Sequence, residues 1–479
     1  MSDEIRMSND ELPIGWAQSK IGNLCSLKNG RAFKPTEWTT SGLPIVRIQN
    51  LNNPKSSYNH FAGEPEPRYH LLGGELLFAW SGTPGTSFGA HVWRGAEAVL
   101  NQHIFRVDFD TENMDKRFFR YAINQKLDEL IDVAHGGVGL RHVTKGTFEG
   151  TEIKVPPLAE QKRIADKLEA VLGRVDACRA RLDRVPALLK RFRQSVLAAA
   201  TNGSLTEEWR VGANAAKAGA AHREIVELIK RRQKDSGSMK KFKEPLIANT
   251  SQWTTEVPVS WSVESVSAFA ECLDSARVPV KRDKRANAKG LYPYYGANGE
   301  VDRVDDFLFD DELVLVTEDE TFYGREKPIA YRSSGKCWVN NHAHVLKATD
   351  VVSSNYLCYA LMYYEIIPWL TGTTGRAKLT QGVLNALPIA VPPKAEMNEI
   401  VRRVEDLFAF ADRIEARLAT AQKTVERLTP ATLAKAFRGE LVPQDPNDEP
   451  ASVLLERMWK ERDFDAKLGR KVLPVRIKH

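Results

Sequence analysis

The sequence lacks long apolar stretches. No run approaches the roughly 18 apolar residues that a membrane-spanning helix requires. The first residues, MSDEIRMSNDELP, have neither the basic start nor the apolar centre of a signal peptide. A cytoplasmic protein is therefore expected, and its 479 residues are enough for two or three domains with sizeable cores.

Cysteine is scarce and scattered. The five cysteines are odd in number and form no CxxC pair or Cys/His cluster with metal-ligand spacing. We therefore expect no metal site, and free, buried thiols in a reducing compartment. The residues concerned are Cys25, Cys178, Cys272, Cys337 and Cys358.

Motifs that carry chemistry are also missing. The chain has no GxxxxGK phosphate loop and no glycine-rich turn between a strand and a helix that would hold a nucleotide or S-adenosylmethionine. The two Pro-Pro pairs, 156–157 and 392–393, lack the flanking residues of an amino-methyltransferase site. The acidic clusters 310–312 and 318–320 have no lysine in register, as a metal-dependent nuclease would need. We expect neither a catalytic site nor a bound cofactor in this chain.

Charge alone excludes little. The chain holds 68 Lys and Arg against 62 Asp and Glu, a formal net charge of +6. A mildly basic balance is compatible with an acidic polymer as partner but does not identify one.

A long internal repeat dominates the sequence. The segment VPPLAE at 155–160 recurs as VPPKAE at 391–396, and the offset of 236 residues then holds without a gap for about fifty residues. Weaker matches lie upstream: LPIGW at 12–16 resembles VPVSW at 257–261, and NQH at 101–103 resembles NNH at 340–342. Each half therefore consists of a variable block followed by a better-matched segment.

Both matched segments have the pattern of a long amphipathic helix. Apolar residues alternate at steps of four and three over more than four heptads, which is typical of a coiled-coil seam. A helix of roughly 40 residues would be ~60 Å long, so two of them could form a spacer rod. We predict that the two seams pair, antiparallel, through Ile164, Leu168, Val171, Val175, Leu182 and Leu189 on the first helix and Ile400, Val404, Leu407, Ile414, Leu418 and Val425 on the second.

A second interpretation of this pattern is that each helix packs separately on its own domain. Pro186 and Pro430 predict a kink or a short break late in each helix. Gly203 and Gly439 are the predicted helix ends.

The variable blocks are rich in glycine, proline, aromatic residues and short apolar runs. Strands are predicted at 43–48, 75–79, 103–107, 313–316 and 344–346, and helices at 118–123 and 356–361. The fold class is therefore α+β: two mixed α/β domains separated by two long antiparallel helices, related by a pseudo-two-fold internal repeat. The predicted domains are 1–155, 156–212 (first long helix), 213–250 (basic linker or helix), 251–390, 391–442 (second long helix) and 443–479 (tail).

The pattern of the matched segments resembles that of a known family. PPLAEQKRI at 156–164 is similar to the opening of the central conserved region of type I restriction-modification specificity subunits, and 190–197 and 202–210 continue it. AKAFRGEL at 434–441 resembles the end of the distal conserved region, and LPIGW the start of a target recognition domain. Met397 and Lys394 depart from the usual Gln and Leu of the motif, without disturbing a helix.

The resemblance implies a DNA-recognition subunit without catalysis of its own. Each recognition domain would read one half of a bipartite, asymmetric target in double-stranded DNA, and the helices would set the spacing. Two modification subunits, which bind S-adenosylmethionine and methylate adenine, would dock on the helices. Two restriction subunits, which use ATP and Mg, would add translocation and cleavage. Host defence by DNA methylation and restriction is the function expected.

Base and phosphate contacts are expected from polar and basic side chains on loops of each block. A plain surface charge is the alternative for any single one of them. The basic runs at 230–234 and 240–243 could contact the nucleic-acid backbone, but a solvated helix-and-linker connection is favoured. His103 and His342, at equivalent places, are predicted to be hydrogen-bonded structural residues rather than catalytic ones. The candidate DNA contacts are Arg31, Lys34, Arg47, Asn50, Arg141 and Lys145 in the first block and Lys281, Arg282, Lys284, Lys289, Tyr292, Arg325, Arg376 and Lys378 in the second.

Three other functions remain open from the sequence alone. A stand-alone sequence-specific DNA-binding regulator would bind its target without a modification subunit. An enzyme fused to its own reader would bind S-adenosylmethionine by itself. A purely structural coiled-coil adaptor leaves the two large, unlike blocks unexplained.

Overall fold

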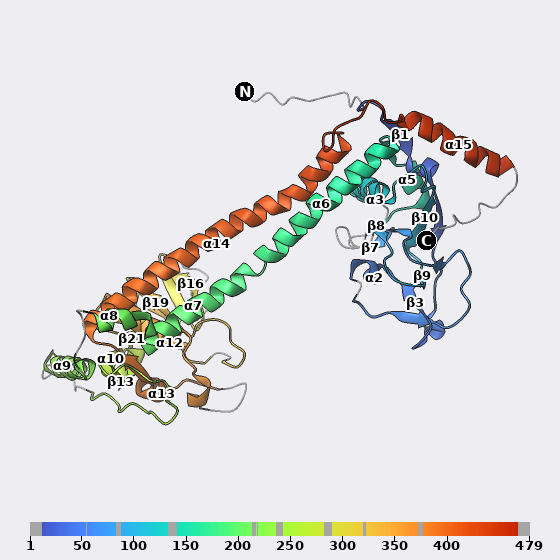
Figure 1. Ribbon diagram of the computed structural model, residues 1–479. Coiled ribbons are helices and arrows are strands. Elements are labelled where there is room, and N and C mark those ends of the chain that lie inside the picture. The colour runs from blue at the N-terminus through green and yellow to red at the C-terminus, as the bar shows by residue number, and fades with distance from the viewer. Residues whose placement is uncertain are drawn as a thin grey trace. The chain divides into compact units, whose positions relative to one another are not determined.

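The computed structural model describes residues 12–53, 55–82, 88–132, 141–212, 217, 219–235, 243–281, 290–319, 322–371 and 377–467 (Figure 1). The chain forms two compact units. Unit 1 contains Met1–Leu182 and Ala421–His479, and unit 2 contains Asp183–Thr420. Each unit therefore combines one variable block with parts of both matched segments.

Unit 1 holds two four-stranded sheets. One has the order β2 (Cys25–Asn29), β10 (Ile104–Phe109), β6 (Leu76–Ala79), β8 (Gly89–Val92) and is antiparallel. The other has the order β4 (Asn59–Phe61), β3 (Leu43–Val46), β9 (Ala98–Leu100), β5 (His70–Leu71), with β3 and β9 parallel. Two further pairs join β1 (Ala17–Lys20) to β12 (Glu152–Val155) and β7 (Ser81–Gly82) to β11 (Arg141–His142).

Unit 2 repeats this arrangement with different residues. Its antiparallel sheet has the order β14 (Glu271–Cys272), β21 (Ala343–Lys347), β18 (Leu313–Thr317), β19 (Ala330–Ser333). Its mixed sheet has the order β16 (Gly299–Val304), β15 (Tyr292–Gly296), β20 (Lys336–Val339), β17 (Phe309–Asp310), with β15 and β20 parallel. β13 (Ser262–Ser265) pairs with β22 (Pro388–Val391) as β1 does with β12.

The central strand of each antiparallel sheet is buried on both faces. In β18, Val314 and Val316 pack in the core that includes α12 (Val351–Met362), while Leu313 and Leu315 pack toward β20 of the second sheet. Successive side chains of a strand point to opposite faces, so a strand covered on both sides becomes an uninterrupted apolar run. This explains why these strands were evident in the sequence as LVLV and ELLFA.

The remaining short helices connect and cover the sheets. Unit 1 contains α1 (Ile21–Leu24), α2 (Ile48–Asn52), α3 (Lys116–Gln125), α4 (Leu127–Asp132), α5 (Lys145–Gly150) and α15 (Ala451–Lys467). Unit 2 contains α8 (Glu207–Val211), α9 (Ala220–Asp235), α10 (Val266–Phe269) and α13 (Gln381–Ala386) besides α12. The α+β class and the internal repeat are confirmed, as are the predicted helices at 118–123 and 356–361.

The matched segments are long helices: α6 (Leu158–Leu182), α7 (Val185–Asn202) and α14 (Lys394–Phe437). The break predicted at Pro186 is confirmed, since α6 ends at Leu182 and α7 begins with the proline in its first turn. Of the kink or short break predicted at Pro430, the break is absent: α14 continues through this proline to Phe437. Proline removes only one backbone N–H donor, and the neighbouring turns of a 44-residue helix remain bonded.

Within each unit the start of one long helix packs beside the end of another. In unit 2, Arg193 of α7 binds Asp412 of α14 at 2.6 Å. Leu205, which follows Arg193 in sequence, accepts a bond at 2.8 Å from Arg403, which precedes Asp412, so the two segments run antiparallel (Figure 1). In unit 1, Phe437 shares a core with Ile164 and Leu168.

The predicted seam residues differ in burial. Ile164 and Leu168, like Ile400 and Val404, are fully buried, but they lie in the core of their own unit as well as beside the second helix. The two interpretations of the heptad pattern therefore both apply to the helix starts. Val175, Leu189, Leu418 and Val425 are also buried, whereas Val171, Leu182, Leu407 and Ile414 are half-buried. Cys178, expected to be a buried thiol, is exposed.

Candidate nucleic-acid interface

A buried tryptophan–glutamate hydrogen bond marks the start of each long helix pair. The indole Nε1 of Trp16 donates to Glu160 Oε2 at 3.1 Å in unit 1, and that of Trp261 donates to Glu396 Oε2 at 2.9 Å in unit 2. Both glutamates are at most 1% exposed. The LPIGW and VPVSW segments, which the sequence matched only loosely, therefore hold the PPxAE helix starts in the same way.

The second carboxylate oxygen distinguishes the two units. Glu396 Oε1 accepts from the Thr206 hydroxyl at 2.7 Å and forms an ion pair with Arg210. Glu160 Oε1 is buried without a hydrogen-bond partner, and Val442 stands where the repeat places Thr206. Burial raises the pKa of Glu160 above its ordinary value of 4.5, although the bond from Trp16 and the charge of Arg163 act against this.

This asymmetry predicts a pH dependence in unit 1. A carboxyl group whose pKa is raised by folding adds stability below its ordinary pKa and loses it as the pH rises through the raised value. We expect unit 1 to become less stable as the pH rises from 4.5 through that value, and Glu160→Gln to remove this loss because the amide oxygen still accepts from Trp16. Urea unfolding at several pH values, followed by hydrogen exchange of peptides around Trp16, measures this. The same dependence of stability on pH in the wild type and in Glu160→Gln would contradict this expectation.

The helix ends repeat the same construction. Gly203 and Gly439 both adopt positive φ, 86° and 75°, a conformation that favours glycine and commonly ends helices. A Cβ at Gly203 would lie 2.5 Å from Pro258 Cγ, and one at Gly439 would lie 2.7 Å from Pro13 Cγ. The helix ends predicted from the sequence are confirmed, and each lies against the proline of its LPxxW-like segment.

The repeat extends into two helices whose equivalence the sequence did not reveal. The N–H of Ala221 in α9 donates to Ser260 O at 3.2 Å, and the N–H of Ala451 in α15 donates to the equivalent Gly15 O at 2.8 Å. Both helices bind the LPxxW-like segment of their unit through their first turn. Their separation in sequence differs from the 236 residues of the main repeat, because the segments that precede them differ in length. That change in spacing hid the match.

The predicted DNA contacts of unit 1 fall into two groups. Lys34 is exposed, and Lys145 at the start of α5 is 55% exposed, with Glu149 Oε1 3.6 Å from its Nζ. Arg31 pairs with Glu37 and Arg47 lies over the Trp38 ring, so both are partly engaged. The side chain of Arg141 lies outside the described residues.

Asn50 does not fit its predicted role. It is 1% exposed, and its amide bonds to the backbone of Arg47, Ser56 and Ser57. These bonds order the loop after α2, so the side chain is part of the fold and does not reach a ligand.

In unit 2 the exposed candidates are Lys281 and Lys378, the latter 57% exposed with Asp319 3.8 Å away. Tyr292 packs edge-on against Phe307. Arg325 is half-buried, and its guanidinium donates to Asn298, Thr317 and backbone carbonyls of its own loop, so it is partly engaged in the fold. Arg282, Lys284, Lys289 and Arg376 lie outside the described residues.

Equivalent strand positions carry different chemistry in the two units. The backbone N–H of Trp80 donates to the backbone O of His103 at 3.1 Å, and that of Glu318 donates to His342 O at 3.1 Å. Trp80 in unit 1 therefore corresponds to Glu318 in unit 2, and His103 to His342. In unit 1 the Trp80 ring stacks on Phe105, lies edge-on to His103 and donates to Asn29. In unit 2 the corresponding residues are Glu318, His344, His342 and Asp274, and His344 Nδ1 lies 2.6 Å from Asp274 and 3.8 Å from Glu318. One backbone arrangement thus presents an aromatic cluster in one unit and a polar cluster in the other.

Comparison with known proteins gives this architecture a family. The family model of the type I restriction modification DNA specificity domain matches residues 13–186 and 258–422. The chain belongs to this family. The specificity subunit of the Escherichia coli type I restriction enzyme EcoBI is 28% identical over 93% of this chain and 92% of its own length, and that of StySPI from Salmonella potsdam is 27% identical over 95% and 97%.

A solved structure supports the fold. One chain, from work on complex assembly and conformational transition of the type I R-M system, matches with a TM-score of 0.56 and 17% identity over 90% of this chain and all of that one. The protein is thus a DNA-binding specificity subunit, the non-catalytic part of a type I restriction-modification complex. Among the described residues, no helix is long and apolar enough to cross a membrane.

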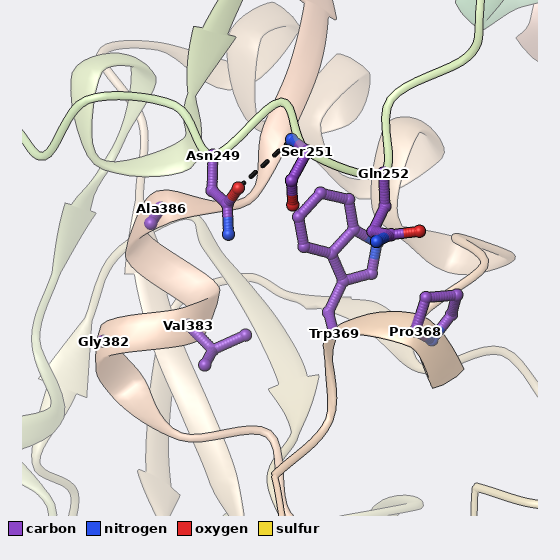
Figure 2. Close-up of a pocket in the computed structure, with 8 residues that line it drawn as sticks. All are labelled: Asn249, Ser251, Gln252, Pro368, Trp369, Gly382, Val383 and Ala386. Atoms are coloured by element: carbon purple, nitrogen blue, oxygen red, sulfur yellow. Dashed lines mark hydrogen bonds between the residues drawn. The ribbon is translucent and has the colours of Figure 1, made fainter.

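One pocket in the described part of this specificity subunit is lined by uncharged residues alone. It has a volume of about 280 Å³ and lies in unit 2 between the 249–252 segment and α13 (Figure 2). Its eight lining residues include Asn249, whose Oδ1 accepts from Ser251 N–H at 3.2 Å, and the indole of Trp369. None of the eight is charged, so the pocket offers neither an acid nor a base.

One residue of the basic run at 230–234 is structural, while Lys230, Arg231 and Lys234 are exposed. Arg232 is turned inward from α9, and its guanidinium donates to Ala268 O at 3.1 Å and Phe269 O at 2.5 Å at the end of α10. Burial lowers the pKa of Arg232. The favoured interpretation as a helical connection agrees with these contacts.

The two equivalent histidines differ. His342 is 51% exposed, and its Nδ1 lies 2.8 Å from Asp319. His103 has φ 72° and a buried Nδ1 without a hydrogen-bond partner, so the expected hydrogen-bonded histidine holds for His342 alone. Burial and the neighbouring His142 lower the pKa of His103.

Proposed function

We propose that this specificity subunit reads a bipartite, asymmetric DNA target, one half with each sheet-rich domain, and docks two modification subunits at its two matched helix starts. The supporting observation is the contrast between the repeats. The Trp–Glu bonds and helix ends are alike in both units, whereas the equivalent strand positions differ in charge and aromaticity. A common scaffold with different reading surfaces suits two identical partners and two unlike half-sites.

Each docking surface would centre on an exposed apolar side chain. Ile14 in LPIGW is 81% exposed and Val259 in VPVSW is 80% exposed, at equivalent positions beside the buried tryptophans. An exposed, branched apolar residue kept in both copies is suited to a partner's apolar pocket. Two equal sites predict two copies of the same subunit.

The other partners follow from the family role. The modification subunits would supply S-adenosylmethionine and adenine methylation, and two restriction subunits would supply the ATP- and Mg-dependent translocation and cleavage. The distance between half-sites would be set by the helices, with about 34–36 Å corresponding to one turn of DNA.

Dependence on the partner tests this function against a stand-alone regulator. Fluorescently labelled duplexes carrying the target are titrated with the full chain alone and with the chain plus its modification subunit. We expect specific binding and adenine methylation only in the mixture. Full target selectivity by the chain alone would favour the regulator.

The exposed lysines are predicted to contact phosphates. Replacing Lys34, Lys145, Lys281 or Lys378 by alanine should weaken binding of the assembled complex to all duplexes alike and reduce the salt slope by about one per residue, because one fewer counterion is released. Lys460 in α15, 80% exposed, is the control and should leave the slope unchanged. Salt slopes equal to wild type for all four variants would remove these lysines from the interface.

A further inference from the structure

A buried charged network in unit 2 links three segments of the second domain. His344 of β21 is 1% exposed. Its Nδ1 lies 2.6 Å from Asp274 Oδ2 and 3.8 Å from Glu318 Oε2, and Arg277 pairs with both carboxylates at 3.3 and 2.7 Å. Two carboxyl groups thus face one guanidinium and one imidazole.

Both ring nitrogens of His344 face acceptors. Nδ1 faces the Asp274 carboxylate, and Nε2 lies 2.6 Å from the backbone carbonyl oxygen of Leu379. A carbonyl oxygen has no proton to donate, and a neutral imidazole has only one N–H. Burial acts to raise the pKa of Asp274, but the bonds from His344 and Val345 and the charge of Arg277 keep it below its ordinary value. Both ring nitrogens can donate to the oxygens that they face only if the ring carries both protons.

The protonated ring holds the backbone next to Lys378. Leu379 N–H donates to Glu318 O at 2.9 Å, so its peptide groups are fixed on both sides, and Lys378 pairs with Thr371 through two backbone bonds. In unit 1, Val143 N–H donates to Trp80 O in the same way, but Phe105 stands at the place of His344 and has no N–H to give.

We propose that His344 is a buried imidazolium and a positioning residue that fixes Lys378 and Leu379, so that DNA recognition by the second domain, unlike that by the first, depends on this proton. The DNA part rests on the proposed function, and the protonation does not. If a ring proton of His344 is lost at higher pH, one ring nitrogen keeps only a lone pair, which faces an acceptor oxygen at 2.6 Å. The hydrogen bond of His344 to Leu379 or to Asp274 is then lost. Binding should therefore weaken as the pH rises.

The groups that face the ring define its surroundings. Asp274 and Arg277 follow β14, and Glu318 follows β18. Next to them, Asp319 lies within ion-pair distance of both His342 and Lys378. Cys272 lies beside Asp274, and burial raises the pKa of its thiol to about 11, so it stays neutral. With Arg277 bound to both carboxylates and both ring nitrogens occupied, the network is complete without a cation.

The first test is the protonation itself. The full chain is labelled with ¹⁵N-histidine, and the His344 signals are assigned by their absence in His344→Phe. We expect two hydrogen-bonded ring N–H protons near neutral pH. A single N–H signal would overturn the proposal, and so would loss of both signals on adding zinc, which would indicate a metal site.

The second test is the pH profile of DNA binding by the chain with its modification subunits. The double variant Asp274→Asn/His344→Phe installs the residues of unit 1, Asn29 and Phe105, and avoids leaving a buried carboxylate unpaired. Between about pH 6 and about pH 9 the wild type should lose about tenfold more affinity than this variant, the effect of one charge-assisted hydrogen bond. His222→Gln, a 64% exposed histidine paired with Glu264, is the control and should follow the wild type.

The outcomes separate the two proposals. Superimposed profiles of wild type and double variant would overturn the positioning role. Absence of any specific DNA binding would contradict the proposed function, while the ring N–H signals would still decide the state of His344.

Discussion

Glu396→Ala is expected to destabilise unit 2 by about 3–5 kcal/mol. The substitution leaves the Arg210 guanidinium, 16% exposed, without its carboxylate, and removes the acceptor of the Trp261 indole and the Thr206 hydroxyl. A buried charge that loses its partner keeps the full cost of leaving water. The helix start and the VPVSW segment should separate first, because Glu396 joins them.

Urea unfolding with hydrogen exchange of peptides around Trp261 measures the loss. Glu160→Ala is the matched control in unit 1, where only Trp16 donates to the carboxylate, and should cost less. Equal losses of stability in the two variants would show that the ion pair with Arg210 adds nothing, and would contradict the expected difference between the units.

Ile14→Asp and Val259→Asp should each remove one modification subunit, and the double variant should remove both. A charge placed in an apolar pocket of the partner should weaken docking by about 2 kcal/mol, or about thirtyfold, at each site. Both side chains are about four-fifths exposed, so the fold should be unaffected.

Native mass spectrometry of the assembled complex counts the subunits. Leu72→Asp in unit 1 and Leu291→Asp in unit 2, at residues 60% and 63% exposed, are controls for the added charge and should retain two subunits. A double variant that still binds two modification subunits would place the docking surfaces elsewhere.

The features that depend on regular spacing were predictable from the sequence. The heptad pattern, the Pro-Pro starts and Gly203 and Gly439 indicated the long helices and their ends, and continuous apolar runs indicated the central strands. Such signals are local, because the 3.6- and 2-residue periods are written in neighbouring residues. The family resemblance, which the comparisons confirmed, rested on the same segments.

Features formed by distant residues could not be read in this way. Asn50 and Arg325 resemble candidate DNA contacts in the sequence, but in the structure both side chains donate to nearby backbone carbonyl oxygens. The pairing of Glu396 with Arg210, 186 residues apart, has no local signature. The equivalence of α9 and α15 was hidden by unequal spacing, and the contact of His344 Nε2 with the Leu379 carbonyl joins residues 35 positions apart.

Mapping of methylated adenines tests the central claim most directly. Genomic DNA from cells that contain this specificity subunit and its modification subunits is sequenced for adenine methylation. Two domains with one fold and unlike reading surfaces predict a single motif of two different short parts separated by a fixed, unspecified gap. A continuous motif, or two identical halves, would contradict a scaffold that carries two different readers.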